Sequence, residues 1–195
     1  HDVDRDGDED IVAVFGEYEH SFAALLIAIN NGAGVFAARP PIEVGVAPRT
    51  VKVTDVNQDG WADFVVSSER ARSVFVALNR GADGEGNWLG VGEPLRFPPQ
   101  GFPNLFPFGL DIGDIDGDGW VDVAVTTLVP GDDGELQLLL NRGLDKTGAW
   151  VGLAPAIAFP TYTFTASVRI VDLNRDGWND VLVGLFREDK GIVHF

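Results

Sequence analysis

The chain contains no cysteine, no methionine and only three histidines among its 195 residues. The absence of cysteine excludes disulfides, thiolate metal sites and a cysteine nucleophile. The longest apolar run, Phe22–Ile29, is far shorter than the roughly 20 residues of a membrane-spanning helix, so membrane insertion is not expected. Because an initiator methionine is also absent and the chain opens inside a motif, we expect a trimmed or processed segment of a longer chain.

Basic residues are scarce as well. The chain has 14 lysines and arginines against 30 acids, which gives a formal net charge of −16. A nucleic-acid backbone or an anionic membrane surface would be repelled by this charge, so neither is an expected partner. With 45% hydrophobic residues, the chain is nevertheless expected to be globular rather than disordered.

Nearly half of the acids fall in four segments that align without gaps, at Asp2–Asp10, Asp55–Asp63, Asp114–Asp122 and Asp172–Asp180. Each segment reads D-x-[DN]-x-D-G-x-x-D, and the motif positions together hold 14 aspartates. Carboxylates this close repel one another unless a cation neutralises them. Calcium is favoured, because it accepts about six to eight oxygen ligands in flexible loops, whereas magnesium requires a stricter octahedron.

We predict one calcium ion in each loop, or about four in all. The predicted ligands are the side chains at loop positions 1, 3, 5 and 9 and the backbone carbonyl at position 7, while glycine at position 6 permits the turn. These residues are Asp2, Asp4, Asp6, Asp8, Asp10, Asp55, Asn57, Asp59, Trp61, Asp63, Asp114, Asp116, Asp118, Trp120, Asp122, Asp172, Asn174, Asp176, Trp178 and Asp180. Four identical patterns disfavour the alternative of Asx-rich surface turns without an ion. An EF-hand needs Glu at position 12, where this chain has Ala13, Val66, Val125 and Val183.

The motifs begin 53, 59 and 58 residues apart, which indicates a repeat architecture. A short run rich in β-branched residues follows each motif, at Ile11–Phe15, Phe64–Val66, Val123–Val125 and Val181–Val183. A second run lies at Phe22–Ile29, Val74–Leu78, Leu136–Leu140 and Ile192–Val193, and in three units it ends in Asn before a glycine turn. Weaker strands are predicted at Val35–Ala38, Pro94–Phe97 and Pro155–Phe159, and before the later motifs at Thr50–Thr54, Leu110–Gly113 and Ser167–Val171.

Each full unit therefore has four strands, A to D, with the acidic loop between A and B. Radial repetition of such units predicts an all-β fold, a β-propeller of four-stranded blades. We predict one domain over residues 1–195, with blade units at approximately 1–44, 45–104, 105–161 and 162–195. The first unit lacks strand A and the last lacks strand D, so 14 strands are expected.

The segment Val51–Val66, followed by Asn79-Arg-Gly81, resembles the FG-GAP/VCBS repeats of integrin-α-type propellers and bacterial surface proteins. The resemblance covers essentially the whole chain, although the Phe-Gly and Gly-Ala-Pro signatures are degenerate. It implies a ring of usually seven blades, calcium in the A–B loops, and roles in adhesion, ligand binding or scaffolding. We therefore expect this chain to be part of a larger ring, completed by further blades or by another chain.

Catalytic patterns are not evident in the sequence. His1, His20 and His194 form no nucleophile or zinc motif, and acids outside the loops, such as Asp132, Asp133 and Glu69, lack a context that would raise their pKa. The absence of such patterns disfavours an enzyme, although propellers also occur in polysaccharide lyases and glycoside hydrolases, which keeps that alternative open.

The favoured function is an extracellular or cell-surface, calcium-stabilised module for adhesion, for binding a protein or carbohydrate, or for assembly. A subunit of a surface fibre is a further alternative. Recognition surfaces are expected on the aromatic D–A connectors, Phe97–Phe108 and Phe159–Phe164, on the face opposite the acidic loops, although packing of these rings between blades is the stronger expectation. Trp61, Trp120 and Trp178 are expected to pack between blades, and Trp88 and Trp150 to lie on the calcium face.

Overall fold

A computed structural model shows an all-β chain and describes residues 1–16, 23–98, 105–128, 134–161, 164–187 and 191–193. Four antiparallel sheets follow one another along the chain. They comprise β1 (Ile11–Gly16), β2 (Ala23–Asn30), β3 (Phe36–Ala38) and β4 (Ile42–Glu43); β5 (Pro48–Thr54), β6 (Asp63–Ser68), β7 (Ser73–Ala77) and β8 (Leu95–Phe97); β9 (Phe106–Gly113), β10 (Asp122–Leu128), β11 (Gly134–Leu139) and β12 (Ile157–Pro160); and β13 (Phe164–Val171), β14 (Asp180–Arg187) and β15 (Gly191–Val193). No helix long and apolar enough to cross a bilayer occurs in these ranges.

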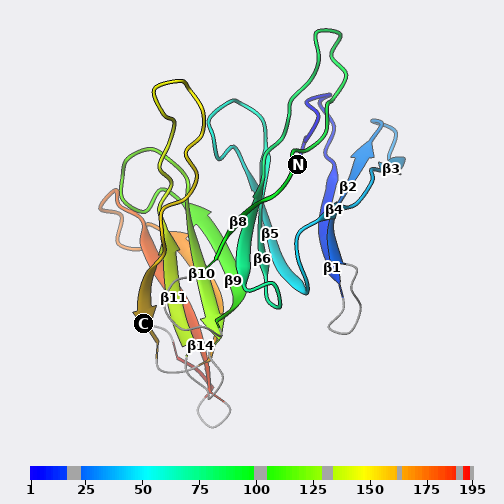
Figure 1. Cartoon of the computed structure of the whole chain (residues 1–195). Coiled ribbons are helices and arrows are strands. Elements are labelled where there is room, and N and C mark those ends of the chain that lie inside the picture. The colour runs from blue at the N-terminus through cyan, green and yellow to red at the C-terminus, as the bar shows by residue number, and fades with distance from the viewer. Residues whose placement is uncertain (17–22, 99–104, 129–133, 162–163, 188–190, 194–195) are drawn as a thin grey trace.

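The sheets stand side by side in chain order, as blades of a propeller do (Figure 1). The second sheet has the strand order β5-β6-β7-β8 and the third has β9-β10-β11-β12, so each is a complete A-to-D blade. Strands β5, β9 and β13 contact the neighbouring sheets, whereas β8 and β12 are the outer strands of their own sheets. The predicted propeller architecture of four-stranded blades is thereby confirmed for this arc.

One outer strand differs from the prediction. The strand expected at Val35–Ala38 is present as β3, and a further short strand that the sequence did not predict, β4, also pairs with β2. The described residues therefore form 15 strands rather than the 14 expected. Pro40 and Pro41 lie between β3 and β4. Proline has no N–H to donate to a β-ladder, so two consecutive prolines interrupt the strand.

The apolar core lies between neighbouring blades. Position 2 of an acidic loop and position 10 of the next blade belong to the same apolar cluster, as shown by Val3 with Phe64, Val56 with Val123, and Ile115 with Val181. Val3, Phe64, Val56 and Val123 are all buried. These alternating apolar contacts fix how far each blade is rotated from its neighbour.

Charged side chains also connect the inner strands. Lys52 Nζ lies 2.6 Å from Asp111 Oδ1, and Ile170 N donates to Asp111 Oδ2 at 2.9 Å. Burial of Asp111 opposes its ionisation, but the hydrogen bonds from Lys52 and Ile170 hold the pKa of this carboxyl below its ordinary value. The second, third and fourth blades are thus joined through one carboxylate.

Candidate metal centres

Each acidic loop has the same backbone conformation. The position-6 glycine has a φ between 88° and 98°, a region that costs glycine little and other residues much. Position 4 is left-handed as well, with φ of 60° at Arg5, 56° at Gln58, 79° at Gly117 and 63° at Arg175. The loop therefore reverses direction twice within nine residues, which brings its side chains toward one region.

The carboxylates and amides of the loop hold this conformation by local hydrogen bonds. In the second loop, Gly60 N donates to Asp55 Oδ2 at 2.7 Å, Asp59 N to Asn57 Oδ1 at 3.1 Å, and Trp61 N to Asp59 Oδ1 at 2.8 Å. The other three loops repeat these three bonds. Such Asx turns are a local property of Asp and Asn, which explains why nine residues are enough to specify the loop.

The position-9 aspartate lies at the base of the loop, and in the first three loops it joins the loop to the asparagine that ends strand C. Asp63 Oδ2 accepts from Val56 N at 2.9 Å, and its Oδ1 accepts from Asn79 N at 2.8 Å. Asp122 makes the same pair of bonds with Ile115 N and Asn141 N. Both carboxylates have no exposed surface. Because two backbone donors orient this carboxylate, it is fixed before any ion binds.

Two groups of three carboxylates are assembled in the part of the chain that the structure describes. They are Asp2, Asp4 and Asp10 in the first loop, and Asp114, Asp116 and Asp122 in the third, with one oxygen from each residue within 4.8 Å of the others in its group. The predicted position-5 ligands, Asp6 and Asp118, are not in these groups.

In the second and fourth loops, position 3 is Asn57 or Asn174, so an amide replaces the position-3 carboxylate that completes the groups of the first and third loops. The amide of each asparagine donates to the position-5 carboxylate at 2.9 Å. The full set of twenty predicted metal ligands, including the position-7 carbonyls, stays a prediction.

The electrostatics of the loops favour a bound cation. Burial, and then repulsion from Asp59 and Asp55, raises the pKa of Asp63 to about 7 despite its two backbone donors. Burial and neighbouring carboxylates also raise the pKa of Asp122 and of Asp4. Burial is the larger cause of these shifts and the neighbouring carboxylates add to it, so a cation beside these groups would favour their ionised forms. In the fourth loop, hydrogen bonds from Trp178 N and the Asn174 amide instead lower the pKa of Asp176.

An unsatisfied oxygen gives a direct test of whether an ion fits. Asp2 Oδ1 is buried and has no hydrogen-bond partner, which is costly for a carboxylate oxygen. It belongs to the group with Asp4 and Asp10, whose donors are all oxygens. Such a donor set suits a hard divalent cation such as calcium. The residues present therefore fit the ion that the sequence predicts.

Sequence reasoning missed the asparagines that end strand C as organisers of the site. Asn79 Nδ2 donates to Val3 O in the preceding loop at 2.9 Å and to Ala62 O in its own loop at 3.1 Å, while its Oδ1 accepts from Gly81 N and Trp88 Nε1. Asn141 repeats all four bonds in the next blade. The signal was the Asn-x-Gly pattern at a constant offset, which by itself predicts only a turn.

The loop tryptophans are placed differently from the prediction. The prediction that Trp61 and Trp120 pack between blades is incomplete, because each ring lies against a glycine of its own blade, Gly81 or Gly143. Trp61 also lies under the guanidinium of Arg5 from the preceding loop, 4.8 Å from the ring centroid. Trp178 does contact the preceding blade, where its ring lies against Gly117, but it is 61% exposed, so the prediction of packing between blades holds only in part.

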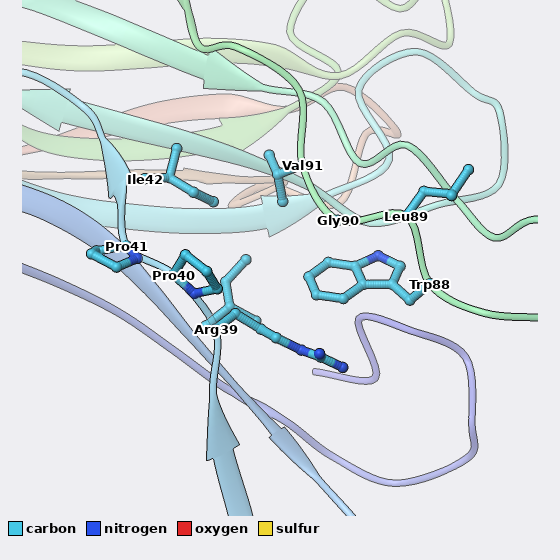
Figure 2. Close-up of a pocket in the computed structure, with 9 residues that line it drawn as sticks. Arg39, Pro40, Pro41, Ile42, Trp88, Leu89, Gly90 and Val91 are labelled. Atoms are coloured by element: carbon cyan, nitrogen blue, oxygen red, sulfur yellow. The ribbon is translucent and has the colours of Figure 1, made fainter.

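A groove of about 340 Å³ lies between the outer strand of the first blade and the β7–β8 hairpin (Figure 2). It is lined by Ile27, Arg39, Pro40, Pro41, Ile42, Trp88, Leu89, Gly90 and Val91. At the same place between the second and third blades, Phe97 lies edge-on to Trp150 with ring centroids 6.0 Å apart. The smaller Ile42 occupies the register position of Phe97, which leaves the groove open.

The two aromatic connectors predicted to form a recognition surface, Phe97–Phe108 and Phe159–Phe164, are described only in part. Residues 99–104 and 162–163 lie outside the described residues, as do His20, His194, Asp132 and Asp133. In the described part, Phe108 lies under the guanidinium of Arg49 at 5.1 Å and Phe106 under that of Arg72 at 5.2 Å. Both rings therefore contact arginines of the second blade. This agrees with the expectation that the aromatic rings of the first connector pack between blades.

Comparison with known proteins places the chain among repeat proteins of this kind. The family model for the FG-GAP-like repeat matches residues 2–66, 55–125 and 114–183. The chain is 35% identical over 148 residues to integrin alpha-7 of Rattus norvegicus, covering 69% of this chain and 12% of that protein. It is 28% identical over 165 residues to integrin alpha-4 of Xenopus laevis, covering 73% of this chain and 14% of that protein. It thus spans about an eighth of the length of these relatives, and through three overlapping matches it belongs to the FG-GAP-like repeat family.

Proposed function

We propose that this chain is a calcium-binding, extracellular propeller module for adhesion or ligand binding, in which calcium is structural. The observation that carries the calcium assignment is the buried, unpartnered Oδ1 of Asp2 beside Asp4 and Asp10. The extracellular location is supported by the family, and by the affinity of about 10⁻⁴–10⁻³ M that is usual for extracellular calcium modules. Such an affinity suits calcium levels outside cells.

Calcium acts here through the arrangement of the loops. In the second and third loops, position 9 holds the loop to strand C, and strand C holds the preceding loop through Asn79 or Asn141. An ion that neutralises a loop therefore stabilises two neighbouring blades at once. A rigid arc of blades presents its connecting loops in a fixed geometry, which is what adhesive recognition requires.

The number of calcium ions bound, and the contribution of the position-3 carboxylate to calcium affinity, can be tested together. Native mass spectrometry of the chain in calcium is expected to show about four bound ions. Asp116→Asn gives the third loop the same residue type at position 3 as the second and fourth loops, and is expected to weaken the affinity of one site. Asp145→Asn removes the same charge from an exposed hairpin and is the matched control. A chain that retains no calcium, or an Asp116→Asn variant that titrates like the control, contradicts the proposal.

Adhesion itself is tested by binding of the chain to arrays of extracellular-matrix proteins and glycans. Binding is expected in calcium and lost in EGTA. No observation on the described residues favours the glycan-cleaving alternative, since the buried Glu69 is paired with Arg49. Turnover of a glycan by the purified chain would favour that alternative.

A further inference from the structure

The groove of Figure 2 is open because one position of the outer strand differs from its equivalents. Opposite the residue five positions before the asparagine that ends strand C, the first blade has Ile42, whereas the next two blades have Phe97 and Phe159. Both walls of the groove belong to this chain, the outer strand of the first blade on one side and the β7–β8 hairpin of the second on the other. A further blade at either end of the arc would stack on the far side of the first or of the fourth blade, away from this groove.

The same groove carries a positive charge that its equivalents lack. Arg39 N donates at 2.8 Å to Ile27 O, three positions before the asparagine that ends strand C. Arg39 therefore stands where the next two blades have the apolar residues Leu95 and Ile157. Its exposed side chain lies over the indole of Trp88, with Cζ 5.6 Å from the ring centroid (Figure 2). Among the described residues no carboxylate lies within ion-pair distance of this guanidinium, although the chain as a whole has a net charge of −16.

The indole beside Arg39 is fixed from behind. Trp88 Nε1 donates to Asn79 Oδ1 at 2.8 Å, and Asn79 Nδ2 donates to Val3 O at 2.9 Å. Contact with the ring uses the charge of the guanidinium but not its N–H donors, which stay available to an acceptor. A recognition surface that is ordered before binding loses less conformational entropy when its ligand arrives.

The lining of the groove favours one kind of ligand. Apart from the Arg39 guanidinium and the Trp88 N–H, which already has an acceptor, the side chains that line the groove are apolar. An acidic group would pair with Arg39, and apolar groups next to it would contact residues such as Ile42 and Val91. A sugar would need partners for several hydroxyls, and these side chains do not supply them. The groove is therefore suited to a peptide that combines one acid with apolar side chains.

We propose that this groove binds a short segment of a partner protein in which aspartate or glutamate lies beside apolar residues. The carboxylate pairs with Arg39, and the apolar side chains lie against Trp88 and between Ile42 and Val91. An acidic segment is repelled by the net charge of the chain, and calcium in the loops would lessen this repulsion. The inference rests on the proposed ligand-binding function and names a site and a class of ligand for it.

The first test is selection from a library of random heptapeptides displayed on phage, with the chain immobilised in calcium buffer. Peptides with an acidic residue flanked by apolar residues are expected to be enriched. Fluorescence anisotropy then measures the Kd of the most enriched acidic peptide and of a twin in which an amide replaces the carboxylate. The twin is expected to bind about 5- to 10-fold more weakly, between the effect of an exposed ion pair and that of a charge-assisted hydrogen bond. A selection without acidic peptides, or a twin that binds equally well, overturns the proposal.

Variants of the groove connect the binding to its residues. Arg39→Gln is expected to weaken the acidic peptide by the same factor of about 5–10 and to leave the amide twin unchanged, because one interaction is removed from either side. Arg142→Gln, which removes an exposed arginine from the next hairpin, is the matched control. Ile42→Phe introduces the residue of the second blade and is expected to weaken both peptides about 10-fold or more by filling the groove, with Leu144→Phe on an exposed hairpin as its control. Full affinity in Arg39→Gln, or in Ile42→Phe that circular dichroism shows to be folded, overturns the proposal.

Parallel measurements separate this groove from the calcium proposal and from other occupants. Calcium titration of Arg39→Gln is expected to match the parent, because no predicted calcium ligand is changed. A chain that binds calcium but no acidic peptide overturns the groove alone, whereas Arg39-dependent peptide binding by a chain that binds no calcium supports the groove and overturns the calcium proposal. Self-association that Arg39→Gln abolishes would make a second copy the occupant, and Arg39-dependent binding of uronic-acid oligosaccharides in place of peptides would make the occupant a glycan. Either result overturns the assignment to a partner's peptide.

Discussion

Removal of calcium is expected to lower the melting temperature of this chain by roughly 10–20 °C. An ion that binds only the folded state at 100-fold above its dissociation constant adds about 2.7 kcal/mol. The two groups of three carboxylates alone therefore contribute roughly 5 kcal/mol. For a domain of this length, each kcal/mol moves the melting temperature by about 2–4 °C.

The assay is differential scanning calorimetry of the chain in about 10 mM calcium and after exchange into EGTA. Sodium chloride at matched ionic strength is the control, because general screening would also reduce repulsion in a chain of net charge −16. Calcium is expected to raise the melting temperature well beyond the salt effect. A melt that is identical in EGTA, or a rise that sodium chloride reproduces in full, would refute the reasoning from loop charge to ion binding.

Three further predictions concern the loop framework. Asn141→Ala removes an amide that makes four buried or partly buried bonds and is expected to lower the free energy of unfolding by about 2–4 kcal/mol in urea titration, whereas Asn87→Ala on an exposed hairpin should cost much less. Gly143 and Gly148 both have a positive φ, but a methyl group at Gly143 would lie 2.7 Å from an indole, whereas one at Gly148 would meet open space. Gly143→Ala should therefore lower the free energy of unfolding more than Gly148→Ala. Equal losses would show that φ alone matters. In the metal-free chain, the raised pKa of Asp63, about 7, means that the folded state binds more protons than the unfolded state between about pH 4 and 7. The stability of the metal-free chain should therefore fall as the pH rises through that window, and calcium should remove this trend. Urea unfolding midpoints measured across the pH range test both expectations. A metal-free chain whose stability rises over the same window would contradict them.

The sequence predicted the strands that carry strong local patterns. The β-branched runs after the four acidic loops became β1, β6, β10 and β14, and the acidic loops themselves have the conformation that Asp, Asn and Gly specify locally. Strands with weak patterns were predicted less well. The inner strands begin earlier than expected, at Pro48, Phe106 and Phe164, because a register shift in each extends its pairing.

The parts of the site that were missed depend on contacts between distant residues. Asn79 bonds to Val3, 76 positions earlier, and nothing near Asn79 in the sequence identifies that partner. The same holds for Trp61, whose neighbours are a glycine in the following hairpin and an arginine in the preceding loop. Local composition therefore identified which residues are acidic and where they cluster, while the register of the sheets decided which side chains meet.

The interrupted outer strand of the first blade has a consequence for solubility. An outermost strand offers free N–H and C=O groups along its length, and a foreign strand can add to such an edge without limit. Pro40 and Pro41 withdraw two donors in succession there, and the outermost strands of the next two blades, β8 and β12, are only three and four residues long. A β-strand from another molecule therefore finds few consecutive hydrogen-bonding groups on these outer strands. We expect this protein to resist fibril formation at concentrations at which a propeller with long, uninterrupted outer strands would aggregate.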